Sequence, residues 1–170
     1  KPFDGLQGRA TAIVAGYALP ESSAVKDGLD FKLPNGEHIG RIKNIVFNDV
    51  QMLVKGGHPL EDRDQSPPEL GVGQYNVSNL KTQPAYGLWA RHAMDLTVTN
   101  CTFNYEQRDS RYALFLDDVI GARIASVKTV RARDNGQVIK TKRSRDVIVE
   151  EAIHYDDNWG DSPAAISGAN

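Results

Sequence analysis

The sequence predicts an all-β protein, specifically a right-handed parallel β-helix with about 25 residues per coil. Two observations favour this fold. Short apolar runs recur at spacings of 26 and then 25 residues, and the 3.6-residue period of a helix does not occur in them. A unit of three short strands cannot bury its own apolar side chains, so each unit must stack on its neighbours.

Two independent sets of residues mark the repeat. The first strands are anchored on Leu88, Leu114 and Ile139, and the second strands on Leu96, Ala122 and Val147. A further copy, residues 45–50, lies 51 residues before the run that begins at Leu96, so an insertion must separate them. Ten inward-pointing residues are expected to be buried: Leu96, Val98, Cys101, Phe103, Leu114, Leu116, Ile124, Val127, Val147 and Val149.

The bend between the second and third strands is expected at one position of each repeat. That position holds Asp49, Asn100, Ser126 and Glu151. Asn and Asp tolerate a left-handed backbone and can form hydrogen bonds along the stack. The column therefore fits a turn that recurs from coil to coil.

Residues 1–170 are expected to form one β-helix domain with two long loop insertions, 16–40 and 56–84. Both are rich in Pro, Gly, Asp and Ser and show no sustained alternation. One follows a first strand and the other precedes the next first strand, so both should flank the same lengthwise face. Loops of this length in a compact domain are usually functional.

Composition narrows the classes of function. The chain has 20 Lys and Arg against 22 Asp and Glu, for a net charge of −2, so we expect no nucleic-acid partner. The single Cys101 cannot form an internal disulfide, and the histidines lack the cysteine neighbours of zinc sites. No apolar stretch approaches the roughly 18 residues of a membrane span. We expect neither a metal nor another cofactor.

Several motifs, taken in order, resemble one known family. They read RATAIVAG, IKNIVFNDV, GGH followed by PPEL, PAYGLWARH, LTVTNCTF and DSRYALFLDDV. This order is similar to the C-terminal coils of bacterial polygalacturonase-like enzymes of glycoside hydrolase family 28, over most of residues 5–157 and most specifically over residues 84–119. The resemblance implies a pectin-directed, inverting hydrolase that acts on an acidic plant polysaccharide or oligosaccharide in an extracellular or periplasmic location.

The catalytic motifs of that family are not present in their usual order. Family members carry N-T-D, D-D, G-H-G and R-I-K on successive coils, whereas this chain lacks N-T-D and G-H-G. Its GGH, at residues 56–58, lies in an insertion, and its RIK, at residues 41–43, precedes its DD. Inversion needs two carboxyl groups about 6.5–9.5 Å apart. We therefore expect the catalytic coils upstream, in a longer β-helix whose N-terminal coils would be a partner of this segment.

Asp117 and Asp118 are only weak catalytic candidates. In the family the catalytic aspartates immediately precede the inward residues of the first strand, whereas this pair follows the strand. A structural role is expected instead, with Asp117 paired to Arg91 and Lys142 in the same outward column. The basic residues of the 41–43 motif are expected to be solvated.

Outward residues of the first strand and those just before it are better candidates for substrate contact. An aromatic ring stacks on the apolar face of a sugar, and Arg can bind a uronate carboxylate with two hydrogen bonds. The candidates are Tyr86, Trp89, Arg91, His92, Arg111 and Tyr112. Two structural alternatives stay open: Trp89 and Phe115 pack beneath the 56–84 insertion, and His92 is a turn residue bonded to backbone.

The substrate mode follows from the two insertions. If they close the first-strand face into a pocket, only a chain end can enter, and the enzyme would be exo-acting. Tyr86, Trp89 and Arg91 would then lie near the pocket wall, with the loop around Tyr75 covering it. An open groove and endo action are the opposing possibility.

Two other functions stay open. One is a non-catalytic carbohydrate-binding or structural β-helix module. The other is a β-helix polysaccharide lyase, which would need a calcium-binding carboxylate cluster or a neutral Lys or Arg base. The nearest such cluster, Glu61, Asp62 and Asp64, is interrupted by Arg63 and reads as a solvated loop.

Overall fold

The computed structural model describes residues 11–18, 39–69, 76–131 and 136–156, and within these ranges the chain is mostly β-strand. The strands are β1 (Ala12–Ala15), β2 (Tyr17–Ala18), β3 (Ile39–Gly40), β4 (Ile42–Asn48), β5 (Gln51–Gly56), β6 (Ala85–Thr99), β7 (Thr102–Gln107), β8 (Tyr112–Ala125), β9 (Lys128–Arg131), β10 (Ile139–Lys142), β11 (Arg145–Glu150) and β12 (Ile153–Asp156). The helices are the 3-10 helix η1 (Leu60–Asp64) and α1 (Val77–Leu80). Neither helix could cross a membrane.

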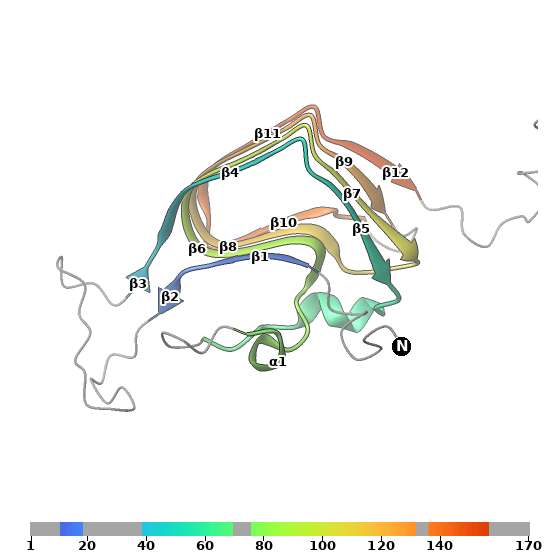
Figure 1. Cartoon of the computed structure of the whole chain (residues 1–170), viewed down its shortest axis with the longest axis horizontal. Coiled ribbons are helices and arrows are strands. Elements are labelled where there is room, and N and C mark those ends of the chain that lie inside the picture. Colours follow the sequence, from blue (N-terminus) through green and yellow to red (C-terminus); the bar gives the residue numbers. More distant parts are fainter. Residues whose placement is uncertain (1–10, 19–38, 70–75, 132–135, 157–170) are drawn as a thin grey trace, which may run out of the picture.

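Strands of successive repeats pair in parallel. The order β1-β6-β8-β10 forms one side, and β4 and β11 extend the same sheet along the second halves of β6 and β8. The third strands form a separate sheet in the order β12-β9-β7-β5. Seen along the stack, these strands outline three sides (Figure 1). The register aligns Leu88 with Leu114 and Leu114 with Ile139, as the sequence spacing predicted.

Left-handed residues mark the bends of each repeat. The predicted column is confirmed, because Asp49, Asn100, Ser126 and Glu151 have φ angles of 57°, 54°, 52° and 51°. Two further columns bend the chain between the first and second strands, and the sequence pattern did not reveal them. They consist of His92, Asp118 and Arg143, and of Asn44, Asp95, Gly121 and Asp146.

One inward column shows how burial depends on position in the stack. Phe47, Val98, Ile124 and Val149 are aligned. The two central residues are fully buried, Phe47 is partly buried, and Val149 is 47% exposed. The prediction that Val149 is buried is therefore wrong: no described strand stacks on the outer edge of β11.

The burial of the other predicted core residues also depends on their position in the stack. Val147, also on β11, is only partly buried. Those in the two central repeats are buried as predicted: Leu96, Val98, Cys101, Phe103, Leu114, Leu116, Ile124 and Val127.

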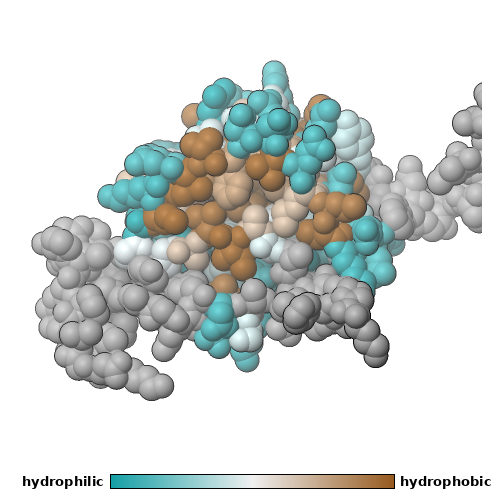
Figure 2. Space-filling model, viewed as in Figure 1, coloured by the Kyte–Doolittle hydropathy of each residue, from teal (hydrophilic) through white to brown (hydrophobic). Residues whose placement is uncertain are grey.

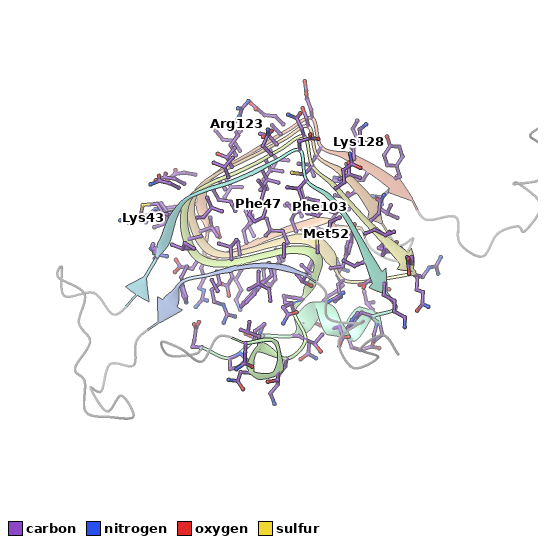
Figure 3. The ribbon with its side chains drawn as sticks, viewed as in Figure 1. Lys43, Phe47, Met52, Phe103, Arg123 and Lys128 are labelled. Carbon is purple, nitrogen blue, oxygen red and sulfur yellow. The ribbon has the colours of Figure 1, made fainter. Side chains whose placement is uncertain are left out.

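The first repeat presents an apolar surface at its outer edge. Phe47 and Met52 point toward the interior, whereas Lys43, Arg123 and Lys128 point away from it (Figure 3). Apolar residues gather at the centre of the viewed face, within a hydrophilic rim (Figure 2). The partly buried residues of this layer that pack on the core include Ile45, Phe47, Val50 and Met52.

The 16–40 insertion lies between β1 and β4 of the first repeat, and the 56–84 insertion lies between β5 and β6. The antiparallel pair β2–β3 lies at the base of the 16–40 insertion, and residues 19–38 lie outside the described ranges. The 56–84 insertion contains η1 and α1, which lie outside the side formed by β1, β6, β8 and β10 (Figure 1).

Candidate anion-binding pocket

The outward face of the first strands is covered by the 56–84 insertion. Trp89 is aligned with Phe115, as alternation along the strand predicted. Both rings are buried in a cluster with Leu80 of α1 and Ala85. The structural alternative for Trp89 and Phe115 therefore describes their packing, and no surface of Trp89 is exposed to a ligand.

Arg91 links the insertion to the sheet. Its Nε donates to Asp117 Oδ2 at 3.1 Å, and its Nη1 donates to the backbone oxygen of Pro67 at 2.7 Å. The guanidinium also lies over the Trp89 ring, 4.7 Å from its centroid. The side chain is 3% exposed, so its charge is held by an internal carboxylate and by carbonyl groups.

Asp117 has the structural pairing with Arg91 that the sequence predicted, but its second partner was predicted wrongly. The second partner is Arg143, whose Nη2 lies 2.8 Å from Asp117 Oδ1, and not Lys142. Arg143 occupies a left-handed bend with a φ of 53°, one residue beyond the position in register with Asp117. The bend brings this side chain to the carboxylate.

Asp118 accepts hydrogen bonds from two elements distant in sequence. Arg41 Nη1 and Nη2 lie 2.6 and 3.0 Å from its two carboxylate oxygens, and His92 Nδ1 lies 2.6 Å from Oδ2. The expectation that Arg41 is solvated is wrong, because its side chain is only 16% exposed and forms this bidentate pair. His92 does occupy a turn, with a φ of 50°, but its ring bonds carboxylates instead of backbone.

The electrostatics of Asp118 disfavour a role as a proton donor. Partial burial raises the pKa of this carboxyl, but hydrogen bonds and charge from Arg41 and His92 outweigh burial and hold the pKa below its ordinary value. A general acid for glycoside cleavage needs a raised pKa.

Glu69 completes the charged cluster from the insertion side. Its Oε2 lies 3.0 Å from His92 Nε2, and its Oε1 lies 3.5 Å from Arg91 Nη1. The Glu69 side chain is 41% exposed, whereas the side chains of Arg91 and His92 are each 3% exposed. Glu69 is not among the residues predicted from the sequence, because an insertion has no period that could place it.

A pocket of about 200 Å³ lies between the insertion and the first-strand face. Residues 63–66 form the side contributed by the insertion. The sheet contributes Arg91, Tyr112, Phe115, Asp117, Lys140 and Lys142. The lining thus contains four cationic side chains, two carboxylates and two aromatic rings.

The lining of this pocket carries more cationic than carboxylate side chains. Asp117 is engaged by Arg91 and Arg143, and Asp64, Lys140 and Lys142 also line the pocket. Arg63 lies over the Tyr112 ring, 4.2 Å from its centroid, and donates to the backbone oxygen of Gln137 at 3.0 Å. The arrangement can bind a small anion that also offers an apolar surface to an aromatic ring.

Two other sequence candidates point into the interior. Tyr86 is buried, and its hydroxyl donates to the backbone oxygen of Val130 at 2.6 Å; burial raises the pKa of this phenol far above its ordinary value. Arg111 is buried against Asp109, with Nε to Oδ1 at 2.9 Å and Nη2 to Oδ2 at 2.8 Å. Substrate contact by either residue stays a prediction that this placement does not support.

Alternation along β6 accounts for the position of Tyr86, which lies two residues before the inward Leu88 and packs in the same core cluster. The register between β6 and β8 shifts between Ala85 and Leu88. Gly87 lies at the shift, where a Cβ would be 2.6 Å from the Ala113 oxygen and 2.9 Å from the Phe103 ring. Only a glycine fits this approach.

Of the six predicted contact residues, Arg91 and Tyr112 line the pocket, and His92 follows Arg91 in the charged cluster. The sequence could have suggested Lys140 and Lys142, since alternation along the strand places them in the outward columns of Trp89 and Arg91. Arg63 and Ser66 lie in the 56–84 insertion, where no alternation could have indicated their direction. Tyr75 lies outside the described residues.

Within the described ranges, no group of three or more His, Cys, Asp or Glu side chains could hold a metal ion. Comparisons with family models, with curated proteins and with solved structures found no significant match to this chain.

Proposed function

We propose that this chain belongs to a pectin-directed glycoside hydrolase of the polygalacturonase or rhamnogalacturonan type, and that its pocket binds an acidic sugar residue. The stacked parallel strands would then be coils of a right-handed parallel β-helix, in an extracellular or periplasmic protein. The observation that carries the proposal is the pocket, where Arg63, Lys140 and Lys142 form the lining together with Tyr112 and Phe115.

The lining suits the two chemical features of a uronate. A carboxylate forms charge-assisted hydrogen bonds with Lys and Arg, and the apolar face of a sugar ring packs on an aromatic side chain. A neutral sugar would offer no carboxylate to Lys140 and Lys142 of the pocket. Recognition of galacturonate over galactose is therefore the expected selectivity.

Catalysis is assigned to coils upstream of this segment. Asp117 and Asp118 are each held by two cationic or histidine side chains, and the pKa of Asp118 is lowered. The lowered pKa makes Asp118 unsuitable as a general acid, and the ion pairs of Asp117 favour a structural role. Residues 1–170 alone should release no reducing sugar from polygalacturonate or rhamnogalacturonan, and turnover that disappears on Asp117→Asn would overturn this assignment.

An exo mode of action is favoured by the small size of the site. The pocket between the insertion and the first-strand face measures about 200 Å³, which is suited to a chain end rather than to a continuous polymer. In the complete enzyme, early products from a pectic polymer should be mono- or disaccharides.

The alternative is a non-catalytic carbohydrate-binding module. The observation that favours it is the engagement of Asp117 and Asp118 in ion pairs, which gives both carboxylates a structural role. The pocket would bind the same class of ligand in that case, and only the activity of the complete protein separates the two functions.

Binding of oligogalacturonate to the 170-residue chain tests the proposal. The Lys140→Ala/Lys142→Ala variant should weaken binding measured by calorimetry about ten-fold, which corresponds to the loss of one good charged contact. Lys128→Ala is the matched control, because Lys128 is exposed on another side of the molecule (Figure 3). Equal affinity for the uncharged galactose oligomer, or an unchanged affinity in the double variant, would contradict the proposal.

A further inference from the structure

The carboxylate of Glu69 lies where a ligand carboxylate would meet the buried side chains of Arg91 and His92. Its oxygens are 3.0 Å from His92 Nε2 and 3.5 Å from Arg91 Nη1. The Glu69 side chain is 41% exposed, and those of its two partners are 3% exposed. Glu69 is therefore more accessible to solvent than either Arg91 or His92.

The partners do not depend on Glu69 alone. Arg91 keeps Asp117 and the backbone oxygen of Pro67, and His92 keeps Asp118 through its other ring nitrogen. Both side chains would thus stay oriented if Glu69 moved away. Their remaining donors would then face a site able to accept another carboxylate.

This site is next to the pocket. Arg91 and Asp117 line the pocket, and Arg91 also contacts Glu69. A ligand with two neighbouring carboxylates could therefore place one in the pocket and the other at Arg91 and His92.

We propose that Glu69 is an internal competitor, whose side chain occupies a second uronate subsite formed by Arg91 and His92. The inference rests on the proposed binding of an acidic glycan in the pocket. Digalacturonate would displace the Glu69 side chain, and its second carboxylate would take over the contacts with Arg91 and His92. The apparent dissociation constant is then the value for the open subsite divided by the fraction of molecules in which Glu69 leaves the subsite open.

The size of the effect follows from this fraction. If Glu69 occupies the subsite in about 90% of molecules, the apparent dissociation constant is raised about ten-fold over its value for the open subsite. Removal of the Glu69 carboxylate should therefore lower the apparent dissociation constant about ten-fold.

A purely structural role for Glu69 predicts the opposite change in binding affinity when the side chain is removed. If Glu69 only fastens the insertion to the sheet, its removal loosens the wall of the pocket, and binding becomes weaker. The direction of the change in affinity therefore separates a competitor from a fastening contact.

The experiment compares digalacturonate binding to the wild-type chain, Glu69→Ala and Glu61→Ala by calorimetry. Glu61→Ala removes the same charge from an exposed position of η1 that does not line the pocket, and should leave affinity within about two-fold. Glu69→Ala should tighten binding about ten-fold, and digalacturonate should perturb the His92 ring signals in NMR spectra of this variant.

Three results would overturn the inference. Unchanged or weaker binding by Glu69→Ala, while the wild type binds, removes the competitor role but leaves the proposed function standing. An equal gain in Glu61→Ala would show a general effect of charge. Absence of binding to all three proteins would overturn the proposed function as well. Should Glu69→Ala fail to fold, Glu69→Gln removes the charge but keeps an oxygen for His92, and the same direction of change is expected.

Discussion

The two halves of strand β6 differ in what lies on their outer side. Residues 85–93 are all buried, whereas residues 94–99 alternate between buried and more exposed positions. The first half carries the insertion on its outward face, through Leu80 at Trp89 and Pro67 at Arg91. The second half faces solvent. Strand β6 is thus buried on both faces along its first half and on only one face along its second half.

An ion pair between Arg and a carboxylate contributes differently to the free energy of unfolding in the two regions. The pair Arg91–Asp117 is 3% and 2% exposed, whereas Arg123–Glu150, on the uncovered side, is 60% and 48% exposed. A buried pair costs several kcal/mol to break because it leaves an unpaired charge, and an exposed pair contributes little. By covering Arg91 and Asp117, the insertion makes their ion pair a buried one that contributes to the stability of the fold.

The largest effect is expected for a core residue of the covered half. Trp89→Ala should lower the free energy of unfolding by about 3–5 kcal/mol, because a fully buried ring is removed. Val46→Ala, at an outward position that is 67% exposed on the uncovered side, should change it by less than about 0.5 kcal/mol. Urea denaturation measures both, and similar losses would show that the insertion does not bury the covered half in solution.

A smaller loss is expected for the buried ion pair. Asp117→Asn should cost about 3 kcal/mol, since Arg91 would lose the charge that compensates it in the interior. Glu150→Gln, the matched change in the exposed pair with Arg123, should cost about 0–1 kcal/mol. A cost for Glu150→Gln as large as that for Asp117→Asn would contradict the contrast between the two regions.

The smallest effect is expected in the dependence of stability on pH. The pKa of Asp118 is lower in the folded chain than in the unfolded chain, despite partial burial, because Arg41 and His92 stabilise its charged form. Its contribution to stability is therefore present above about pH 4, the ordinary value for Asp, and is lost as pH falls through the folded-state pKa.

Comparison with Asp118→Asn isolates this contribution. The difference in urea midpoint between the wild type and the variant should be largest near neutral pH and should shrink below about pH 4. A difference that stays constant on acidification would show that Asp118 stabilises the fold by its hydrogen bonds rather than by its charge.

Much of the fold could be predicted because it repeats. The left-handed residues Asp49 and Asn100 share a column 51 residues apart, and the period alone aligned them. Val149 belongs to the correct inward column but is exposed, because the period specifies direction and not whether another layer lies beyond it. Burial at the edge of a stack depends on what covers it.

The site was less accessible to sequence reasoning, since its contacts do not follow the period. Arg41 reaches Asp118, 77 residues away, and Glu69 reaches His92 from an insertion without alternation. Tyr86 shares the parity of the inward Leu88 and is buried with it in the core, so alternation along the strand already argued against its role as a contact residue. Arg91 and Tyr112 were found because they lie on or beside the regular first strands.

The contacts of the insertion also bear on cooperativity. A stack in which each repeat touches only its neighbours behaves as a one-dimensional array and can unfold stepwise from either end. Here the segment that follows β5 bonds to Arg91 of β6 through Pro67 and to Gln137, just before β10, through Arg63. Loss of the last repeat must therefore break a contact anchored near the first. This lengthwise connection should merge stepwise fraying into a single unfolding transition.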